Sequence, residues 1–226
     1  QQQQQQTTRC SAHPNIRSTD ATSSWTPTDV RSYQTAVDVY YQQHQTLPYP
    51  KEPHVVLSSK PDYDNNNNKR QGILVIGDVH GCFDELVELH RTAVQDVGHD
   101  FEHVILVGDL CNKGPASRAV IQHVRQHAPY WQTVRGNHDN AALQAALGDA
   151  QRRAKPAKYG WVSSLSDEDV VWMAQLPYTI RIPQGSVSGL EQECLIVHAG
   201  LQPSVPLEEQ SIATMTTIRT TVQKSS

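Results

Sequence analysis

The chain has 226 residues, of which 37% are hydrophobic, and its 19 basic and 23 acidic residues give a formal net charge of −4. This length supports one domain of ordinary size with a buried core. The slightly acidic balance excludes a uniformly basic surface, so any nucleotide would have to be recognised locally. No apolar stretch approaches the roughly 18 residues that a membrane-spanning helix needs.

Three segments of different character precede the main domain. Residues 1–26 open with six glutamines and are rich in Ser and Thr. Such a segment cannot bury enough apolar surface to offset the entropy of ordering, so a disordered tail is expected. Residues 27–45 predict an amphipathic helix, because a proline in the first turn is followed by apolar residues at helical spacing. Residues 46–70 contain four prolines and four consecutive asparagines and are predicted to be a linker.

The main domain is expected over residues 71–226. Apolar runs at 73–76, 103–107 and 131–134 predict buried strands, and each is followed by a segment with helical periodicity. This alternation of strands and helices predicts an α/β fold whose sheet begins with parallel strands.

The second half of this domain is predicted to add a loop, a helix and a hairpin. Residues 151–160 are expected to form a basic loop marked by glycine and proline. Ser166 and the three acids after it are a good cap for a helix that ends at Leu176. Strand-like runs at 178–182 and 194–197 are joined by a polar loop, so we expect them to pair as a hairpin.

Four short motifs each follow an apolar run of this domain. They are Gly77-Asp78-Val79-His80-Gly81, Gly108-Asp109-Leu110-Cys111-Asn112-Lys113-Gly114-Pro115, Gly136-Asn137-His138-Asp139 and His198-Ala199-Gly200. The carboxyl ends of the strands in an open α/β sheet border its ligand crevice, so the polar side chains of the motifs are expected to gather there. Oxygen and nitrogen donors gathered in this way suit a pair of divalent metals, and paired metals suit phosphoester hydrolysis.

Five residues of the motifs are candidate metal ligands. Asp78 and His80 lie two positions apart, so in an extended stretch both side chains face the same way and can share one metal. Asp109 has two carboxylate oxygens and could bridge two ions. Asn137 supplies an amide oxygen and His198 supplies an imidazole. Two ions about 3.5–4 Å apart would hold a bridging hydroxide and clamp the phosphoryl oxygens for in-line attack.

Three further residues near these turns are candidates for contact with the substrate. His138 is placed to protonate the departing oxygen as a general acid. Lys113 and Arg135 could neutralise phosphoryl charge, and for Arg135 a structural role is an equal alternative. The remaining histidines of the domain are interpreted as surface or core residues without ligand spacing: His90, His99, His103, His123 and His127.

The cysteines show no pairing pattern and no nucleophile signature. No C-x-x-C pair occurs, which favours a reducing compartment and hence the cytoplasm. Cys82, Cys111 and Cys194 lie in or beside apolar runs, where a thiol is usually a small buried hydrophobe. The segment after Cys82 lacks a phosphate loop closed by arginine, and no Gly-x-x-x-x-Gly-Lys-Ser/Thr loop is present. These absences disfavour thiolate-based and P-loop phosphate chemistry.

Together the motifs resemble the GDxHG, GDxxxxG, GNH and HAG or HGG signatures of calcineurin-like metallophosphoesterases in the phosphoprotein-phosphatase superfamily. The Asn112-Lys113-Gly114-Pro115 ending and the Val197-His198-Ala199-Gly200-Leu201 segment look most like ApaH-like phosphatases, relatives of bacterial symmetrical diadenosine tetraphosphatase. The resemblance covers residues 71–210.

This resemblance implies a β-sandwich flanked by helices. It also implies that Asp78, His80 and a bridging Asp109 hold one metal. The other metal would be held by Asp109, Asn137 and His198, with His138 as the general acid.

The sequence departs from the family pattern in two places. Protein phosphatases carry Asp-Arg where this chain has Asn112-Lys113. Asn112 cannot supply the carboxylate that would keep His138 protonated, and Lys113 cannot grip phosphate with two parallel hydrogen bonds. Both changes disfavour a typical protein Ser/Thr phosphatase. In addition, no histidine follows His198, so the family's last metal-ligand histidine has no counterpart. We therefore expect a truncated second sheet in a sequence that is incomplete at its C-terminal end.

Two functional hypotheses follow from these patterns. The first is a phosphohydrolase that uses two divalent ions, with Mn, Fe, Zn and Co as candidates for the mixed oxygen and nitrogen ligands. Its candidate substrates are phosphorylated small molecules, dinucleoside polyphosphates and other nucleotides, inorganic polyphosphate, capped RNA ends and phosphoproteins. The alternative is an inactive or impaired fragment that acts at most as a binding protein, because the second metal lacks one ligand.

Overall fold

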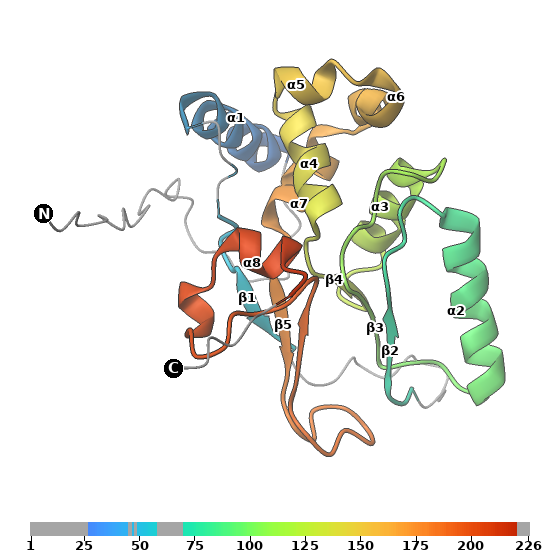
Figure 1. Cartoon of the computed structure of the whole chain (residues 1–226). Helices are drawn as coiled ribbons and strands as arrows, with labels where there is room; N and C mark the ends of the chain where they lie inside the picture. The colour runs from blue at the N-terminus through green and yellow to red at the C-terminus, as the bar shows by residue number, and fades with distance from the viewer. Residues whose placement is uncertain (1–26, 45–46, 48, 58–69, 221–226) are drawn as a thin grey trace, which may run out of the picture.

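The computed structural model describes residues 27–44, 47, 49–57 and 70–220 (Figure 1). The tail over residues 1–26 and much of the linker over 46–70 lie outside the described residues. Among the helices that are described, none is long and apolar enough to span a membrane.

A sheet of three parallel strands forms one layer of the fold. Its order is β2 (Ile73–Ile76), β3 (His103–Leu106) and β4 (Trp131–Thr133). Each strand is connected to the next by a helix, which is the usual way in which parallel neighbours are joined. The predicted parallel start of the sheet is therefore confirmed.

The second sheet also has three strands in the described part of the chain. Its order is β1 (His54–Val56), β5 (Thr179–Ile182) and β6 (Cys194–Val197). Strand β1 is parallel to β5, and β6 is antiparallel to it. The hairpin predicted over residues 178–197 is therefore confirmed.

The alternating side chains of β3 show how the two sheets and the helices are layered. Val104 and Leu106 belong to the large core that the first sheet shares with the helices. Ile105 lies on the opposite face and packs with Ile180 and Ile182 of β5. Successive side chains of a strand point to opposite faces, so β3 is buried between the helical layer and the second sheet. This arrangement confirms the predicted α/β sandwich flanked by helices.

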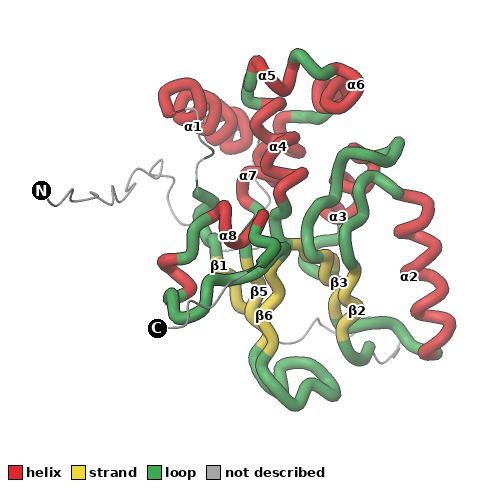
Figure 2. Tube along the Cα trace, viewed as in Figure 1, coloured by secondary structure: helices red, strands yellow, loops and turns green. Residues whose placement is uncertain are grey.

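In Figure 2, α1 and α4 to α7 lie above the strands, α2 lies on the side of β2 and α8 lies on the side of β1. Helix α7 packs against α1, α3 and α4, whereas α2 lies next to α3. The helices are α1 (Pro27–His44), α2 (Phe83–Val97), α3 (Ser117–Gln126), α4 (Asn137–Ala146), α5 (Ala150–Arg153), α6 (Pro156–Tyr159), α7 (Asp167–Gln175) and α8 (Ile212–Thr217), with short 3-10 turns η1 (Gly160–Ser164) and η2 (Leu207–Glu209).

Two local predictions are wrong. Strand β1 lies within the segment expected to be a linker, and its pairing continues where Leu57 N–H donates to the carbonyl of Arg181 at 2.8 Å. A strand of three residues in a proline-rich segment has too short a hydrophobic pattern to be predicted from the sequence. This strand forms through its pairing with β5. The basic loop expected over 151–160 instead contains α5 and α6, which begin after a capping Asp149 and at Pro156.

The burial of the cysteines also differs from the prediction. Cys111 is fully buried as expected, but Cys82 is half-buried and Cys194 is exposed. Cys194 begins β6, an edge strand of the second sheet in the described part of the chain, and its neighbour Leu195 is also exposed. An apolar run in the sequence therefore did not imply burial at this edge.

Helix α1 is part of the core of the domain. Its buried residues Val30, Tyr33, Val37 and Tyr41 belong to the same cluster as the residues of the first sheet. The hydroxyl of Tyr41 also donates to Asp149 Oδ2 at 3.1 Å. The amphipathic pattern that predicted the helix therefore reflects docking onto the main domain, against α7.

We predict that Val37→Ala lowers the free energy of unfolding by about 1–2 kcal/mol, because it leaves a cavity under α1. Val37 is 2% exposed, whereas Val39 on the same helix is 49% exposed. The matched Val39→Ala variant should therefore stay within about 0.5 kcal/mol of the wild type. Urea unfolding followed by circular dichroism measures both values. Equal effects of the two substitutions would show that α1 is not docked in solution.

Candidate metal centre

The four motifs meet at one edge of the sandwich. The parallel register of β2, β3 and β4 places their carboxyl ends side by side, and the first three motifs follow these ends directly. The fourth motif comes from the second sheet, after β6. Its His198 is joined to the first sheet because Nδ1 lies 2.8 Å from the carbonyl oxygen of Val107. The gathering of the motifs therefore depends on both sheets.

Unusual backbone geometry marks the first two motifs. Four non-glycine residues of these two motifs have left-handed backbone angles: His80, Asp109, Asn112 and Lys113, with φ of 50°, 52°, 67° and 68°. This region is costly for residues with a Cβ atom and persists only where the surroundings fix it. Here the N–H of His80 donates to the carbonyl of Asp109 at 2.8 Å, and the N–H of Asp109 donates to Asp139 Oδ2 at 2.8 Å.

Glycine is required where the second and third motifs touch. A Cβ atom on Gly136 would overlap the carboxylate of Asp109. A Cβ atom on Gly108 would lie 2.7 Å from the backbone nitrogen of Gly136. The two loops can therefore approach closely only because both positions lack a side chain.

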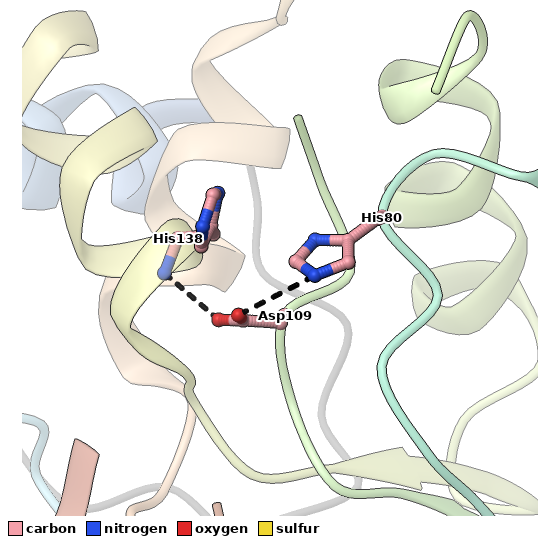
Figure 3. A group of neighbouring side chains, drawn as sticks. All are labelled: His80, Asp109 and His138. Atoms are coloured by element: carbon pink, nitrogen blue, oxygen red, sulfur yellow. Dashed lines mark hydrogen bonds and ion pairs between the residues drawn. The ribbon is translucent and has the colours of Figure 1, made fainter. Parts of the chain in front are cut away.

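Asp109 is shared by two groups of possible ligands. In the first group, His80, Asp109 and His138 each offer an atom within 4.8 Å of the others (Figure 3). In the second group, Asp78, Asp109 and His198 do the same. Each group contains one oxygen of the same buried carboxylate, which is the arrangement needed for a ligand that bridges two ions.

The distances within the centre show which atoms face each other. His80 Nε2 lies 3.4 Å from Asp78 Oδ2 and 3.8 Å from Asp109 Oδ2. His198 Nε2 lies 3.5 Å from Asp109 Oδ1 and 3.1 Å from Asn137 Oδ1. The structure therefore brings together all five side chains that the sequence suggested as metal ligands.

Hydrogen bonds to backbone carbonyls orient both imidazoles. His80 Nδ1 lies 3.2 Å from the carbonyl oxygen of Cys111, and His198 Nδ1 lies 2.8 Å from that of Val107. A carbonyl oxygen can only accept, so each Nδ1 carries the proton and each Nε2 turns its lone pair towards the carboxylates. The Nε2 lone pairs and the carboxylate oxygens therefore face one another, and a cation between them would bind to both. This donor set therefore fits divalent metals of the transition series.

Lys113 brings a positive charge to this centre. Its Nζ lies 2.6 Å from His80 Nε2, at the side of the ring that faces Asp78 and Asp109. The ammonium group is thus within reach of any anion that binds over the carboxylates. This position suits contact with a phosphoryl oxygen, as the sequence suggested.

His138 lies beside the possible ligands. Its backbone N–H donates to Asp109 Oδ1 at 2.8 Å, and its ring packs edge-on against the ring of His80 with centroids 4.7 Å apart. Burial lowers the pKa of His138, the neighbouring cationic groups lower it further, and Asp109 opposes them. The buried Nδ1 has no hydrogen-bond partner among the described residues.

Asn112 supports His138 through a hydrogen bond to its backbone. Its amide nitrogen donates to the carbonyl of His138 at 3.2 Å, while its amide oxygen accepts the indole N–H of Trp161 at 3.1 Å. No local pattern indicated Trp161, because it comes from η1, far along the chain, and only the tertiary structure places it here.

Asp139 is a second residue whose role in the centre is not predicted by the motifs. Its carboxylate is fully buried and accepts the backbone N–H groups of Asp109, Leu110 and Gly136 at 2.8, 2.9 and 2.9 Å. Burial raises the pKa of Asp139, and the N–H donors oppose this shift. Its place at the third position of α4 is the usual place of a capping acid, which was the only available signal.

Arg135 does not reach this centre. Its side chain is 0% exposed, and Nη1 donates to the carbonyls of Met173 and Ala174 at 3.4 and 3.5 Å. The guanidinium also lies 4.6 Å from the centroid of the Tyr178 ring. Cations are favourable at the C-terminal end of a helix such as α7. The geometry supports the structural alternative for Arg135 rather than the phosphate contact.

Comparison with known proteins identifies the family of the chain. Residues 72–223 match the family described as calcineurin-like phosphoesterase, which is well over half of the chain. The chain belongs to this family. Among similar curated proteins are the symmetrical bis(5'-nucleosyl)-tetraphosphatases of Dechloromonas aromatica, 35% identical over 130 residues, and of Aromatoleum aromaticum, 36% identical over 135 residues. The matched regions cover 57% and 58% of this chain, and 43% and 45% of the two relatives.

A solved structure of a similar protein has the same fold. A crystal structure provisionally named a diadenosine tetraphosphatase superposes with a TM-score of 0.52 and 28% identity, covering 74% of this chain and 64% of that one. These similarities confirm the resemblance to symmetrical diadenosine tetraphosphatases. The chain spans less than half the length of the curated relatives that it matches.

We predict that Asp139→Asn lowers the free energy of unfolding by about 2–4 kcal/mol, because several buried N–H donors then face an amide group that cannot accept them all. The exposed Asp96 provides a matched control, and Asp96→Asn should change the value by less than about 0.5 kcal/mol. Chemical denaturation of both variants measures the difference. A value for Asp139→Asn as small as the control would show that this carboxylate does not hold the loops together.

Proposed function

We propose that this chain hydrolyses phosphoester or phosphoanhydride bonds with the help of two divalent ions, and that its substrate class is dinucleoside polyphosphates. The observation that supports this proposal most strongly is the buried Asp109 carboxylate shared by two ligand groups. Family membership supports the reaction class, and the names of the curated relatives support the substrate class.

The ligand assignment is the one that the family resemblance implies, and the contacts of His80 with Asp78 and of His198 with Asn137 support it. We assign Asp78, His80 and Asp109 to one ion, and Asp109, Asn137 and His198 to the other. When bound, the two ions supply Lewis-acid polarisation of phosphoryl oxygens and an activated water nucleophile. Mn, Fe, Zn and Co all suit such a mixture of oxygen and nitrogen ligands.

The remaining side chains of the centre act on the substrate itself. Lys113 neutralises charge on a phosphoryl oxygen from its position beside His80. His138 donates a proton to the departing oxygen, and its backbone is held in place by Asp109 and Asn112.

The surroundings of His138 favour an anhydride over a phosphorylated serine. Asn112 contacts its carbonyl, and the buried Nδ1 has no hydrogen-bond partner among the described residues, so no carboxylate anchors the protonated ring through this atom. A nucleoside phosphate leaves as a stable anion and needs little help from an acid, whereas a serine alkoxide needs a full proton. The site therefore suits nucleotide anhydrides better than phosphoproteins. Inorganic polyphosphate and capped RNA ends share this bond type, and the cytoplasmic location expected from the cysteines stays a prediction.

We predict that the chain hydrolyses a symmetrical dinucleoside tetraphosphate in the presence of Mn²⁺, and that a chelator abolishes this activity. Asp109→Asn should lower the rate by about 100-fold or more. Loss of a residue that only hydrogen-bonds to a metal ligand already lowers metal affinity or activity by about 10- to 100-fold. The exposed Asp96→Asn variant serves as the control and should retain the wild-type rate. Chromatography of the released nucleotides measures each rate. Activity that survives the chelator or Asp109→Asn would contradict the proposal.

Metal content distinguishes the proposed enzyme from an impaired binding protein. Elemental analysis after dialysis against Mn²⁺ should find two ions per chain in the wild type and fewer in Asp109→Asn, because this variant weakens the shared ligand. Fewer than two ions in the wild type, together with no hydrolysis, would favour the impaired alternative.

A further inference from the structure

Two histidines outside the candidate centre lie one turn apart at the C-terminal end of α3, with His123 in its last turn and His127 as its capping residue. His123 and His127 are four positions apart, and their ring centroids are separated by 4.2 Å with planes tilted by 37°. Residues at this spacing are neighbours on a helix surface. The two imidazoles are therefore neighbours on the helix surface, although the sequence interpretation assigned them no ligand spacing.

The helix beneath the pair is firmly held. Val120, Ile121 and Val124 of α3 are all fully buried in the main core. The last turn is closed because the backbone N–H of His127 donates to the carbonyl of His123 at 3.2 Å. The two imidazoles are therefore presented by a rigid scaffold, which lowers the entropic cost of binding a shared ligand.

Ring nitrogens of both side chains are available to a ligand. His127 Nδ1 lies 2.7 Å from the carbonyl oxygen of His123 and must donate to it, so Nε2 keeps its lone pair. The ring of His123 packs edge-on against Trp131 and Phe83, with centroids 4.7 and 5.5 Å apart. Neither of its nitrogens makes a hydrogen bond among the described residues. Burial and the neighbouring imidazoles of His127 and His90 lower the pKa of His123, which favours the neutral form that metals bind.

We propose that His123 and His127 form a bidentate binding site for a borderline divalent cation such as Ni²⁺, Cu²⁺ or Zn²⁺. Imidazole pairs suit these ions, whereas Mg²⁺ and Ca²⁺ prefer oxygen ligands. The nearby His90 is not a third ligand through Nε2, because this atom contacts the hydroxyl of Tyr130 at 3.3 Å. Water would complete the coordination on the exposed side of His127.

This site is separate from the candidate metal centre. The first residue of α3, Ser117, accepts a hydrogen bond from the backbone N–H of Asn112 at 2.9 Å and so lies at the edge of the centre. His123 and His127 lie at the opposite end of the helix. At a rise of about 1.5 Å per residue, His123 is about 9 Å along the helix axis from Ser117. Ion binding at the pair therefore does not depend on the proposed hydrolysis.

The test is a titration of the full chain with Ni²⁺ by isothermal calorimetry, in the wild type and in His127→Gln. His127 is exposed, so its replacement should leave the fold intact, and circular dichroism without metal checks this. His44→Gln is the matched control, because His44 is exposed and has no histidine four positions away on either side. We expect His127→Gln to bind one ion fewer per chain than the wild type and His44→Gln.

A second variant identifies which site is lost. Asp109→Asn disrupts the candidate centre but keeps the histidine pair, so it should retain a Ni²⁺ site that disappears when His127→Gln is added. In Asp109→Asn, Ni²⁺ should also raise the midpoint of thermal unfolding, and this rise should vanish in the double variant. The same stoichiometry and affinity in His127→Gln and wild type would overturn the proposal. So would an Asp109→Asn chain that binds no Ni²⁺.

Discussion

The buried carboxylate of Asp139 is the interaction on which the geometry of the centre depends. Its two oxygens accept backbone N–H groups from the loop after β3 and from the loop after β4. These bonds hold Asp109 in a left-handed backbone conformation that its side chain would otherwise disfavour. Because Asp109 is shared by both ligand groups, the position of one buried acid fixes the middle of the whole centre.

The charges of the centre are arranged around this fixed point. Backbone carbonyls accept from the Nδ1 atoms of His80 and His198 and so turn both Nε2 atoms inward. Lys113 contributes positive charge from one side, while Arg135 is kept away by its burial against Tyr178. A phosphate would therefore meet the flexible ammonium group of Lys113 here rather than a planar guanidinium fork. This difference supports the proposed preference for nucleotide anhydrides over phosphorylated proteins.

Segments that precede the matched family region complete the fold around the centre. Helix α1 adds four side chains to the main core, and β1 adds a parallel strand to the edge of the second sheet. Strand β5 is thereby flanked on both sides, and it leads out of the Pro177 turn whose carbonyl accepts the N–H of Arg135 at 2.8 Å. These segments consequently support the loop that carries Asn137 and His138.

The sequence alone determined the order of strands and helices in the first sheet, the hairpin of β5 and β6, and the four motifs. These features are local, because apolar runs, capping residues and glycines act over a few positions. The sequence also indicated which side chains gather, since the carboxyl ends of parallel strands meet at one edge.

Only the tertiary structure decided the rest. Strand β1 forms through its pairing with β5, Trp161 reaches Asn112 across 49 positions, and Arg135 turns into the core instead of towards the centre. The role of Asp139 likewise depends on the packing of the loop after β3 against the start of α4. Each of these outcomes depends on contacts between residues that are distant in the chain. Local pattern contains no information about such contacts, because they exist only when the layers have packed.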